Sequence, residues 1–137
     1  MNSIIKSIIS YLCVCILIDA AGEQIKDVKA AYKQAKTATA GGDQATGDSV
    51  KKFFENDLKN TFSAFEKQAA SNKSGYWIGS RLSLFDIQLY DLIHFFDDQA
   101  SVQKALDGCN ALKAIHDKVE QTPEIKKWLA ERPDTTF

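Results

Sequence analysis

The chain has 137 residues, which is enough for one domain with one hydrophobic core. Its formal net charge is -1, from 17 Lys and Arg against 18 Asp and Glu, and it has no basic run. This charge pattern argues against nucleic acid as a partner. The three cysteines are Cys13, Cys15 and Cys109. Their spacing is that of neither a disulfide framework nor a zinc site, which favours reduced thiols.

Residues 1–18 form an apolar N-terminal segment, in which Lys6 is followed by an apolar run that ends at Ile18. A lysine before such a run is typical of a signal peptide, and residues 20–22 offer a weak cleavage site. The run is shorter than the ~20 apolar residues of a membrane-spanning helix. Three interpretations stay open: a signal peptide, a helix start packed on the domain, or the beginning of a truncated or misassembled gene model.

Two long helices are predicted next. The first runs from residue 19 to about 36 and has one narrow apolar seam. Small polar residues and glycines predict a loop over 37–48. The second helix begins at Asp48 or Ser49 and reaches about residue 70. The first seam is Ile25, Val28, Tyr32 and Ala35, and the second is Val50, Phe54, Leu58, Phe62, Phe65 and Ala69.

The next helix, over residues 84–96, is expected to be the buried centre of the domain. It is apolar on most of its circumference. Ser83 and Asp86 have the S-x-x-D spacing of a capping box. The Ser83 hydroxyl is expected to accept from the amide of Asp86, and the Asp86 carboxylate from the amide of Ser83. This structural cap would start the central helix.

The last third of the chain predicts three short segments. Residues 97–107 are expected to form a short helix or turn, which Gly108 ends. Residues 111–121 have helical periodicity, and Thr122 followed by Pro123 predicts a new helix. Its inward residues are expected to be Ile125, Trp128 and Leu129. Because no segment alternates over a strand length, the predicted fold class is all-α, a helical bundle of five or six helices.

Two motifs carry a resemblance to a known family. Residues 76–86, Tyr-Trp-Ile-Gly-Ser-Arg-Leu-Ser-Leu-Phe-Asp, resemble the W-L-I-G-x-x-(L/V)-(S/T)-x-x-D signature in the helical domain of cytosolic glutathione transferases. The stretch from Val119 to Phe137 resembles the C-terminal ending of the sigma class. The resemblance covers residues 19–137, the C-terminal helical domain. Family members begin with a thioredoxin-like domain that holds the catalytic tyrosine and a cis-proline, and neither has a counterpart in this chain.

The resemblance implies several site residues. Residues 18–28 match the sigma-class stretch V-D-x-x-x-D-x-x-D-D-F, with Lys26 in place of one acid. Asp27 would then reach across a dimer to the γ-glutamyl ammonium of glutathione. A solvated surface acid is the competing interpretation. Gln88, Leu92 and Phe137 fall where the family lines its pocket for hydrophobic electrophiles, against the alternative of core packing for Leu92.

The two histidines do not suggest a metal site in the sequence. His94 and Asp98 share a helix face and Asp97 is adjacent, but a metal would need further ligands. His94 is therefore expected to be an ordinary partly buried residue, and His116 a surface residue. No metal is predicted.

The resemblance implies a glutathione transferase homologue that conjugates glutathione, as co-substrate, to hydrophobic electrophiles in detoxification. This chain would supply the electrophile wall and the dimer surface of a homodimer, and by itself it is expected to be inactive. The alternative is a non-catalytic binding or structural derivative, like the lens crystallins related to this class. The implied localisation is cytoplasmic, or secreted if residues 1–22 are a signal peptide.

Overall fold

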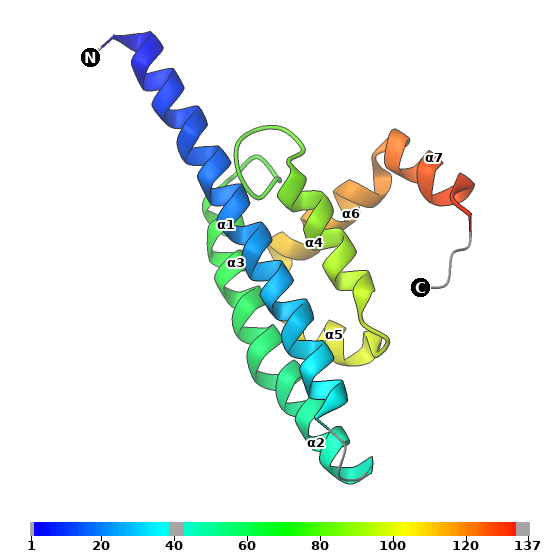
Figure 1. Ribbon diagram of the computed structural model, residues 1–137. Helices are drawn as coiled ribbons and strands as arrows, with labels where there is room; N and C mark the ends of the chain where they lie inside the picture. The colour runs from blue at the N-terminus through cyan, green and yellow to red at the C-terminus, as the bar shows by residue number, and fades with distance from the viewer. Residues whose placement is uncertain (1, 39–42, 134–137) are drawn as a thin grey trace.

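The computed structural model describes residues 2–38 and 43–133, and every regular element in these ranges is helical (Figure 1). The predicted all-α fold class is therefore confirmed. The elements are α1 (Ser3–Thr37), α2 (Asp43–Lys52), the π-helix η1 (Phe53–Leu58), α3 (Lys59–Ser71), α4 (Leu84–Phe95), α5 (Gln99–Ala105), α6 (Asn110–Gln121) and α7 (Pro123–Glu131).

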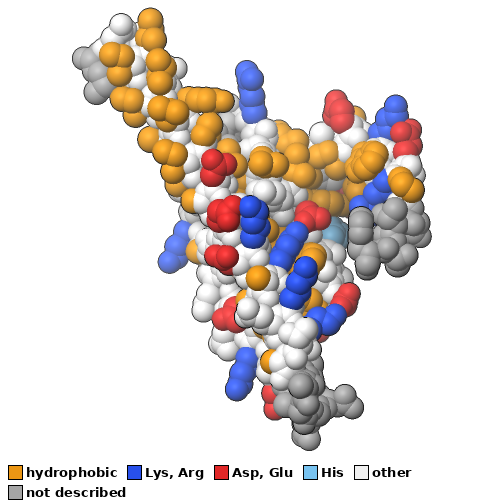
Figure 2. Space-filling model, in the orientation of Figure 1, with side chains coloured by type: hydrophobic (Ala, Val, Ile, Leu, Met, Phe, Trp, Pro, Cys, Tyr) orange, Lys and Arg blue, Asp and Glu red, His pale blue; other side chains and the backbone are white. Residues whose placement is uncertain are grey.

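Helix α1 has two halves with different surroundings. It begins after Asn2, whose side chain accepts a hydrogen bond from the amide of Ile4 at 3.2 Å. It continues without a break through residues 18 and 19, where we expected the helix to begin. Its second half packs into the core through the predicted seam. Its first half projects beyond the other helices and shows mostly apolar side chains (Figures 1 and 2).

The second predicted helix is longer and less regular than expected. It begins at Asp43, so that residues 43–48, predicted as loop, are helical, while residues 39–42 lie outside the described ranges. Its middle turn is the π-helix η1. The wider π turn reduces the angle between successive side chains. As a result the neighbours Phe53 and Phe54 are both buried, at 2% and 4% exposure.

The core lies where α4 meets the long helices. Helix α1 packs against α4, α2 and η1, and α6 packs against both α3 and α4. One end of the core is an aromatic cluster in which the ring of Tyr32 lies 4.9 Å from Phe96 and 5.4 Å from Phe53. Two ion pairs also join α1 to the α4 region: Lys29 with Asp91, and Lys36 with Asp97 at 2.7 Å.

The C-terminal helices differ from the sequence prediction in one side chain. Helix α7 begins at Pro123 as expected, but it contains no buried residue. Ile125 and Leu129 are half-buried, whereas Trp128, expected to face inward, is 62% exposed. The reason is that, among the described helices, α7 has a substantial contact with α6 only. The opposite face of α7 is therefore not covered by another described helix. Thr122 precedes α7 but its hydroxyl donates back to Lys118 O at 3.0 Å instead of capping α7.

Candidate functional site

The capping box forms as the sequence predicts, and it does more than start α4. The amide of Asp86 donates to Ser83 Oγ at 3.4 Å, and Asp86 Oδ2 accepts from the Ser83 amide at 2.8 Å and from the Ser83 hydroxyl at 3.0 Å. Asp86 Oδ1 accepts from the amide of Trp77 at 2.9 Å. The carboxylate has no exposed surface. It therefore ties the segment before α4 to the start of that helix.

The segment that Asp86 holds is also anchored by aromatic packing. The Trp77 ring stacks on Phe85 with centroids 3.9 Å apart, and its Nε1–H donates to Phe65 O at 3.2 Å. Asn72 Nδ2 donates to the carbonyls of Tyr76 and Gly79. These contacts fix residues 72–83 against α3 and α4. The box is a structural element of the fold.

Asp27 lies on the exposed face of α1. It is followed one position later by the buried Val28, so its carboxylate points away from the core of this chain. An exposed carboxylate on a long helix is available to a partner, as the resemblance implies, and it is equally compatible with a solvated acid. The assignment of Asp27 to glutathione thus stays a prediction.

Gln88 of α4 lies against Gly22 of α1. A Cβ added to Gly22 would lie 3.1 Å from Gln88 Oε1, so the glycine leaves the space that the amide occupies. Gln88 Oε1 is buried and has no hydrogen-bond partner among the described residues. A buried oxygen without a donor costs free energy. It is therefore free to accept a hydrogen bond from a ligand that reaches this junction.

The remaining two predicted wall residues are placed differently. Leu92 has no exposed surface and is part of the core cluster. Phe137 lies outside the described residues. The structure thus brings Gln88 close to the buried part of α1, whereas it encloses Leu92 in the core.

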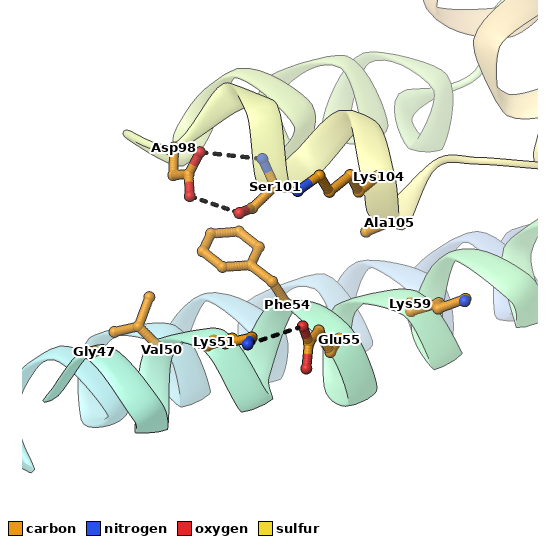
Figure 3. Close-up of a pocket in the computed structure, with 10 residues that line it drawn as sticks. All are labelled: Gly47, Val50, Lys51, Phe54, Glu55, Lys59, Asp98, Ser101, Lys104 and Ala105. Atoms are coloured by element: carbon orange, nitrogen blue, oxygen red, sulfur yellow. Dashed lines mark hydrogen bonds and ion pairs between the residues drawn. The ribbon is translucent and has the colours of Figure 1, made fainter. Parts of the chain in front are cut away.

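A concave surface in the described part of the chain lies elsewhere, between the α2–η1–α3 run and α5 (Figure 3). It has a volume of about 530 Å³. Its floor includes Phe54 and Val50, and its rim carries Lys51, Lys104 and Asp98. Asp98 caps α5, because its carboxylate accepts hydrogen bonds from the amide and the hydroxyl of Ser101. Neither Gln88 nor Leu92 is among the described residues that line this groove.

The two histidines meet, which the sequence did not indicate. His116 is half-buried, and its Nε2 lies 3.0 Å from Nε2 of His94. The expectation that His116 is a surface residue is therefore only partly right, because this residue is half-buried. His94, expected to be partly buried, is an exposed residue, but the partial desolvation of its ring, followed by the proximity of His116, holds its pKa below the ordinary value. The encounter depends on how α4 and α6 pack, which residues 22 positions apart do not reveal.

The cap at the start of α6 is a second contact that the sequence did not indicate. Cys109, at the N-cap position, makes no side-chain cap. Glu66 of α3 supplies it instead, accepting from the amides of Ala111 and Leu112 at 2.9 Å each. All three cysteines are free thiols. Burial, and then the charge of Glu66, raises the pKa of Cys109, so this thiol stays protonated at neutral pH.

Comparisons with known proteins agree with this architecture. Residues 26–132 match the family described as the glutathione S-transferase C-terminal domain. The chain is 28% identical over 120 residues to probable glutathione S-transferase 9 of Caenorhabditis elegans, and 26% identical over 121 residues to glutathione S-transferase 1 of Ascaris suum. These alignments cover 87% and 88% of this chain, but 57% and 58% of the relatives.

The crystal structure of the monomeric glutathione S-transferase Na-GST-3 from the hookworm Necator americanus has a similar fold. It superposes with a TM-score of 0.68 and 26% sequence identity over 89% of this chain and 59% of that protein. The chain thus spans somewhat more than half the length of the relatives that it matches. The family match and the shared fold together show that the chain belongs to the glutathione S-transferase family, and that its helices correspond to the C-terminal domain.

Proposed function

We propose that this chain provides the electrophile-binding and dimer-forming half of a sigma-like glutathione transferase. The observation that carries the proposal is the family match over residues 26–132, on a helical domain whose predicted core and capping box both form. The sigma-class assignment rests on the ending from Val119 to Phe137 and on the acidic stretch around Asp27. The reaction would be attack of the glutathione thiolate on a hydrophobic electrophile.

In this proposal the two substrates meet different residues. Asp27 would bind the γ-glutamyl ammonium of a glutathione molecule held by the partner subunit, which its exposure on α1 allows. The electrophile would lie against the α1–α4 junction, where Gln88 Oε1 has no internal donor. Leu92 and Phe137 would complete an apolar wall, which for Leu92 requires α4 to shift, because that side chain is enclosed in the structure. An apolar wall with one polar group suits variable hydrophobic substrates.

The test joins the thioredoxin-like domain of a family member to residue 19 of this chain and measures glutathione conjugation. Asp27→Asn should raise the KM for glutathione about fivefold and change kcat by less than about twofold, because it removes one exposed charge contact. Glu23→Gln is the matched control, since Glu23 is an exposed acid one turn away that pairs with Lys26 within α1. Equal effects of the two substitutions would contradict the role of Asp27.

We also propose a cytoplasmic location, as the resemblance implies. The competing possibility is secretion. By length and composition alone, α1 is apolar enough to cross a membrane, and signal sequences near the N-terminus pass the same test. Mass spectrometry of the protein purified from its own cells distinguishes these cases. Loss of residues up to about 22 would indicate secretion and overturn the cytoplasmic location.

A further inference from the structure

The last turn of α4 and the middle of α6 bring together the two histidines of the chain. Their Nε2 atoms are 3.0 Å apart while their ring centroids are 5.2 Å apart. Each ring therefore turns its Nε2 toward the other. The ring of Tyr90 lies against both, at 4.5 Å from His94 and 4.9 Å from His116. Tyr90 stacks on His116 and meets His94 at a tilt, so both imidazoles pack against the same ring.

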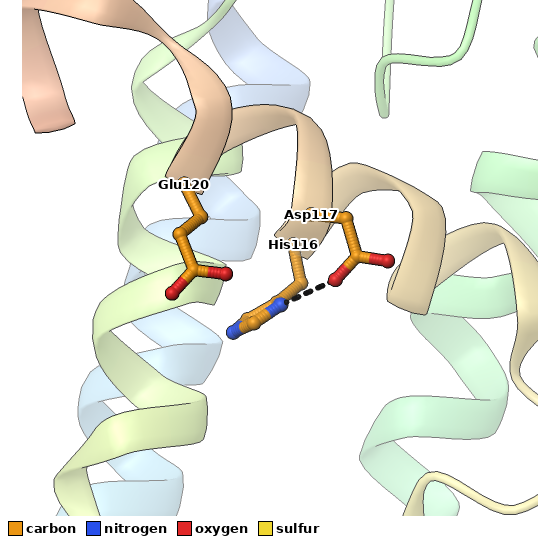
Figure 4. A group of neighbouring side chains, drawn as sticks. All are labelled: His116, Asp117 and Glu120. Atoms are coloured by element: carbon orange, nitrogen blue, oxygen red, sulfur yellow. Dashed lines mark hydrogen bonds and ion pairs between the residues drawn. The ribbon is translucent and has the colours of Figure 1, made fainter.

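Two carboxylates of α6 lie beside His116. Asp117 Oδ1 is 3.0 Å from His116 Nδ1, and oxygens of Asp117 and Glu120 lie within 4.8 Å of a ring nitrogen of His116 and of each other. Figure 4 shows Asp117 at one ring nitrogen of His116 and Glu120 on the side of the other. When Asp117 accepts the Nδ1 proton of neutral His116, the lone pair at Nε2 is left facing His94.

We propose that His94, His116 and Glu120 form a site for a divalent transition-metal ion of the zinc type, with Asp117 orienting His116. A metal-bound histidine commonly donates its second ring N–H to a carboxylate, as His116 does to Asp117. Imidazole together with one carboxylate is a donor set that suits Zn²⁺, and Mg²⁺ or Ca²⁺ would instead select oxygen ligands.

The spacing of the nitrogens fits this assignment. Two imidazoles at ~2.0–2.1 Å from one ion have nitrogens about 2.9 Å apart at a right angle and about 3.3 Å apart at the tetrahedral angle. The observed 3.0 Å lies between these values. Ordinary hydrogen bonding between the two rings would also give this distance, but it would assign no role to Glu120. With three protein ligands the ion would keep an open position for water.

The site would act as a clamp between helices. His94 belongs to α4 and His116 and Glu120 belong to α6, so a bound ion would join two elements that otherwise meet through core packing. Anything that binds the folded chain but not the unfolded chain raises its stability. The ion would therefore raise the melting temperature and fix the surface formed by the end of α4.

Two measurements test the proposal: zinc titration by calorimetry and cobalt titration by visible absorption. Both use the full untagged chain with Cys13→Ser and Cys15→Ser, because these substitutions remove the accessible thiols as competing ligands. We expect one ion per chain. His94→Gln or His116→Gln should weaken zinc binding at least about 100-fold, and Asp117→Asn about 10–100-fold. Glu55→Gln, an exposed acid on η1, is the matched control and should leave binding unchanged.

The chain also offers a direct readout that does not depend on the variants. With two histidines, the Cε1–H signals in the proton spectrum are two, and zinc should shift both at the same stoichiometry. His94 is exposed, so His94→Gln should fold even if His116→Gln does not. Unchanged zinc affinity in folded His94→Gln, no saturation by about millimolar zinc, or loss of binding upon replacement of the two cysteines would each overturn the proposal.

Discussion

Asp86 is a carboxylate without exposed surface whose charge is balanced by hydrogen-bond donors instead of a cation. It accepts from the amides of Trp77 and Ser83 and from the Ser83 hydroxyl. Charge-assisted hydrogen bonds of this kind are stronger than neutral ones, and the positive end of the α4 dipole adds to them. Removal of the carboxylate would leave two amides without a partner in a region that water does not reach easily.

The first prediction is that Asp86→Ala lowers the free energy of unfolding by about 2–4 kcal/mol, because it orphans buried donors. Ser83→Ala should lower it by about 1 kcal/mol, since the cap bond that it removes is long. Asp91→Ala is the control on the same helix: it breaks the exposed pair with Lys29 and should change stability by less than about 1 kcal/mol. Urea midpoints that are the same for Asp86→Ala and Asp91→Ala would refute this ranking.

The second prediction concerns Glu66, which caps α6 from α3. Glu66→Ala should destabilise the protein by about 1–2 kcal/mol, because it removes the partners of the Ala111 and Leu112 amides. Glu66→Gln should cost less, since one amide oxygen still accepts. The comparison is thermal unfolding followed by circular dichroism, with Glu55→Ala as the control. A result in which Gln is as costly as Ala would show that charge matters more than hydrogen bonding.

These residues show where sequence reasoning succeeds at the smallest scale. Ser83 and Asp86 were predictable, because both partners of a capping box lie within one turn. Glu66 was not, because its partners lie 45 and 46 positions away. The same limit applies to His94 and His116. Local spacing determines local caps, whereas contacts between helices depend on packing that spacing does not specify.

At the scale of elements, α1 combines a buried half with an exposed one. Ala21, Gly22, Ile25, Val28 and Tyr32 are buried, and side chains from Ile4 to Leu17 include many that are exposed by about half or more. The buried half contacts α4, where the absence of a side chain at Gly22 makes room for Gln88. The exposed half adds apolar surface to solvent, which is typical of an interaction or targeting segment.

The third prediction is that a chain starting at Asp19 keeps its helical circular dichroism and cooperative unfolding, and is more soluble. The deletion removes mainly exposed apolar surface. It also removes the half-buried Ile18, which packs against the core, and this loss should lower the free energy of unfolding by about 1 kcal/mol. A chain starting at Ile25 is the control. It also removes Ala21 and Gly22, so it should unfold at a clearly lower temperature. Non-cooperative unfolding of the first variant would show that residues 1–18 stabilise the core.

Helix positions were mostly predictable because each helix has a clear apolar face. The seams from Ile25 to Tyr32 and from Phe54 to Ala69 are buried as expected. The extension of α2 into the small polar residues and the π turn at Phe53 were not predicted. Glycine and small polar residues weaken helix propensity, but tertiary packing overrides it. Trp128 shows the converse, since an apolar residue at the right spacing needs a facing element in order to be buried.

At the scale of the whole molecule, the predicted site depends on groups that lie beyond this helical domain. The family was recognisable from residues 76–86 and 119–137, and the match over 26–132 confirms it. Gln88 and Asp27 are placed by α4 and α1, but the position of a bound electrophile also depends on the domain that would face them. That information lies in an interface, and a single helical domain does not contain it.

The last prediction is that the purified 137-residue chain conjugates glutathione no faster than the uncatalysed reaction. A free thiol has a pKa of ~8.5, so a few per cent is thiolate at neutral pH. Catalysis needs a donor fixed beside the sulfur and a bound tripeptide. An exposed charge contact such as that of Asp27 contributes about 0–1 kcal/mol, whereas millimolar affinity needs about 4 kcal/mol.

Neither Tyr11 nor Tyr32 is well placed to supply the hydroxyl that would stabilise a glutathione thiolate. Tyr11 is 69% exposed on the projecting half of α1, and Tyr32 is 6% exposed, with its ring packed into the aromatic cluster. Calorimetric titration with glutathione and a conjugation assay measure binding and turnover, with the chain joined to a thioredoxin-like domain as the positive control. Saturable binding below about 1 mM by the chain alone would contradict the prediction. Tyr11→Phe and Tyr32→Phe would then identify the hydroxyl responsible, because phenylalanine keeps the ring and removes the donor.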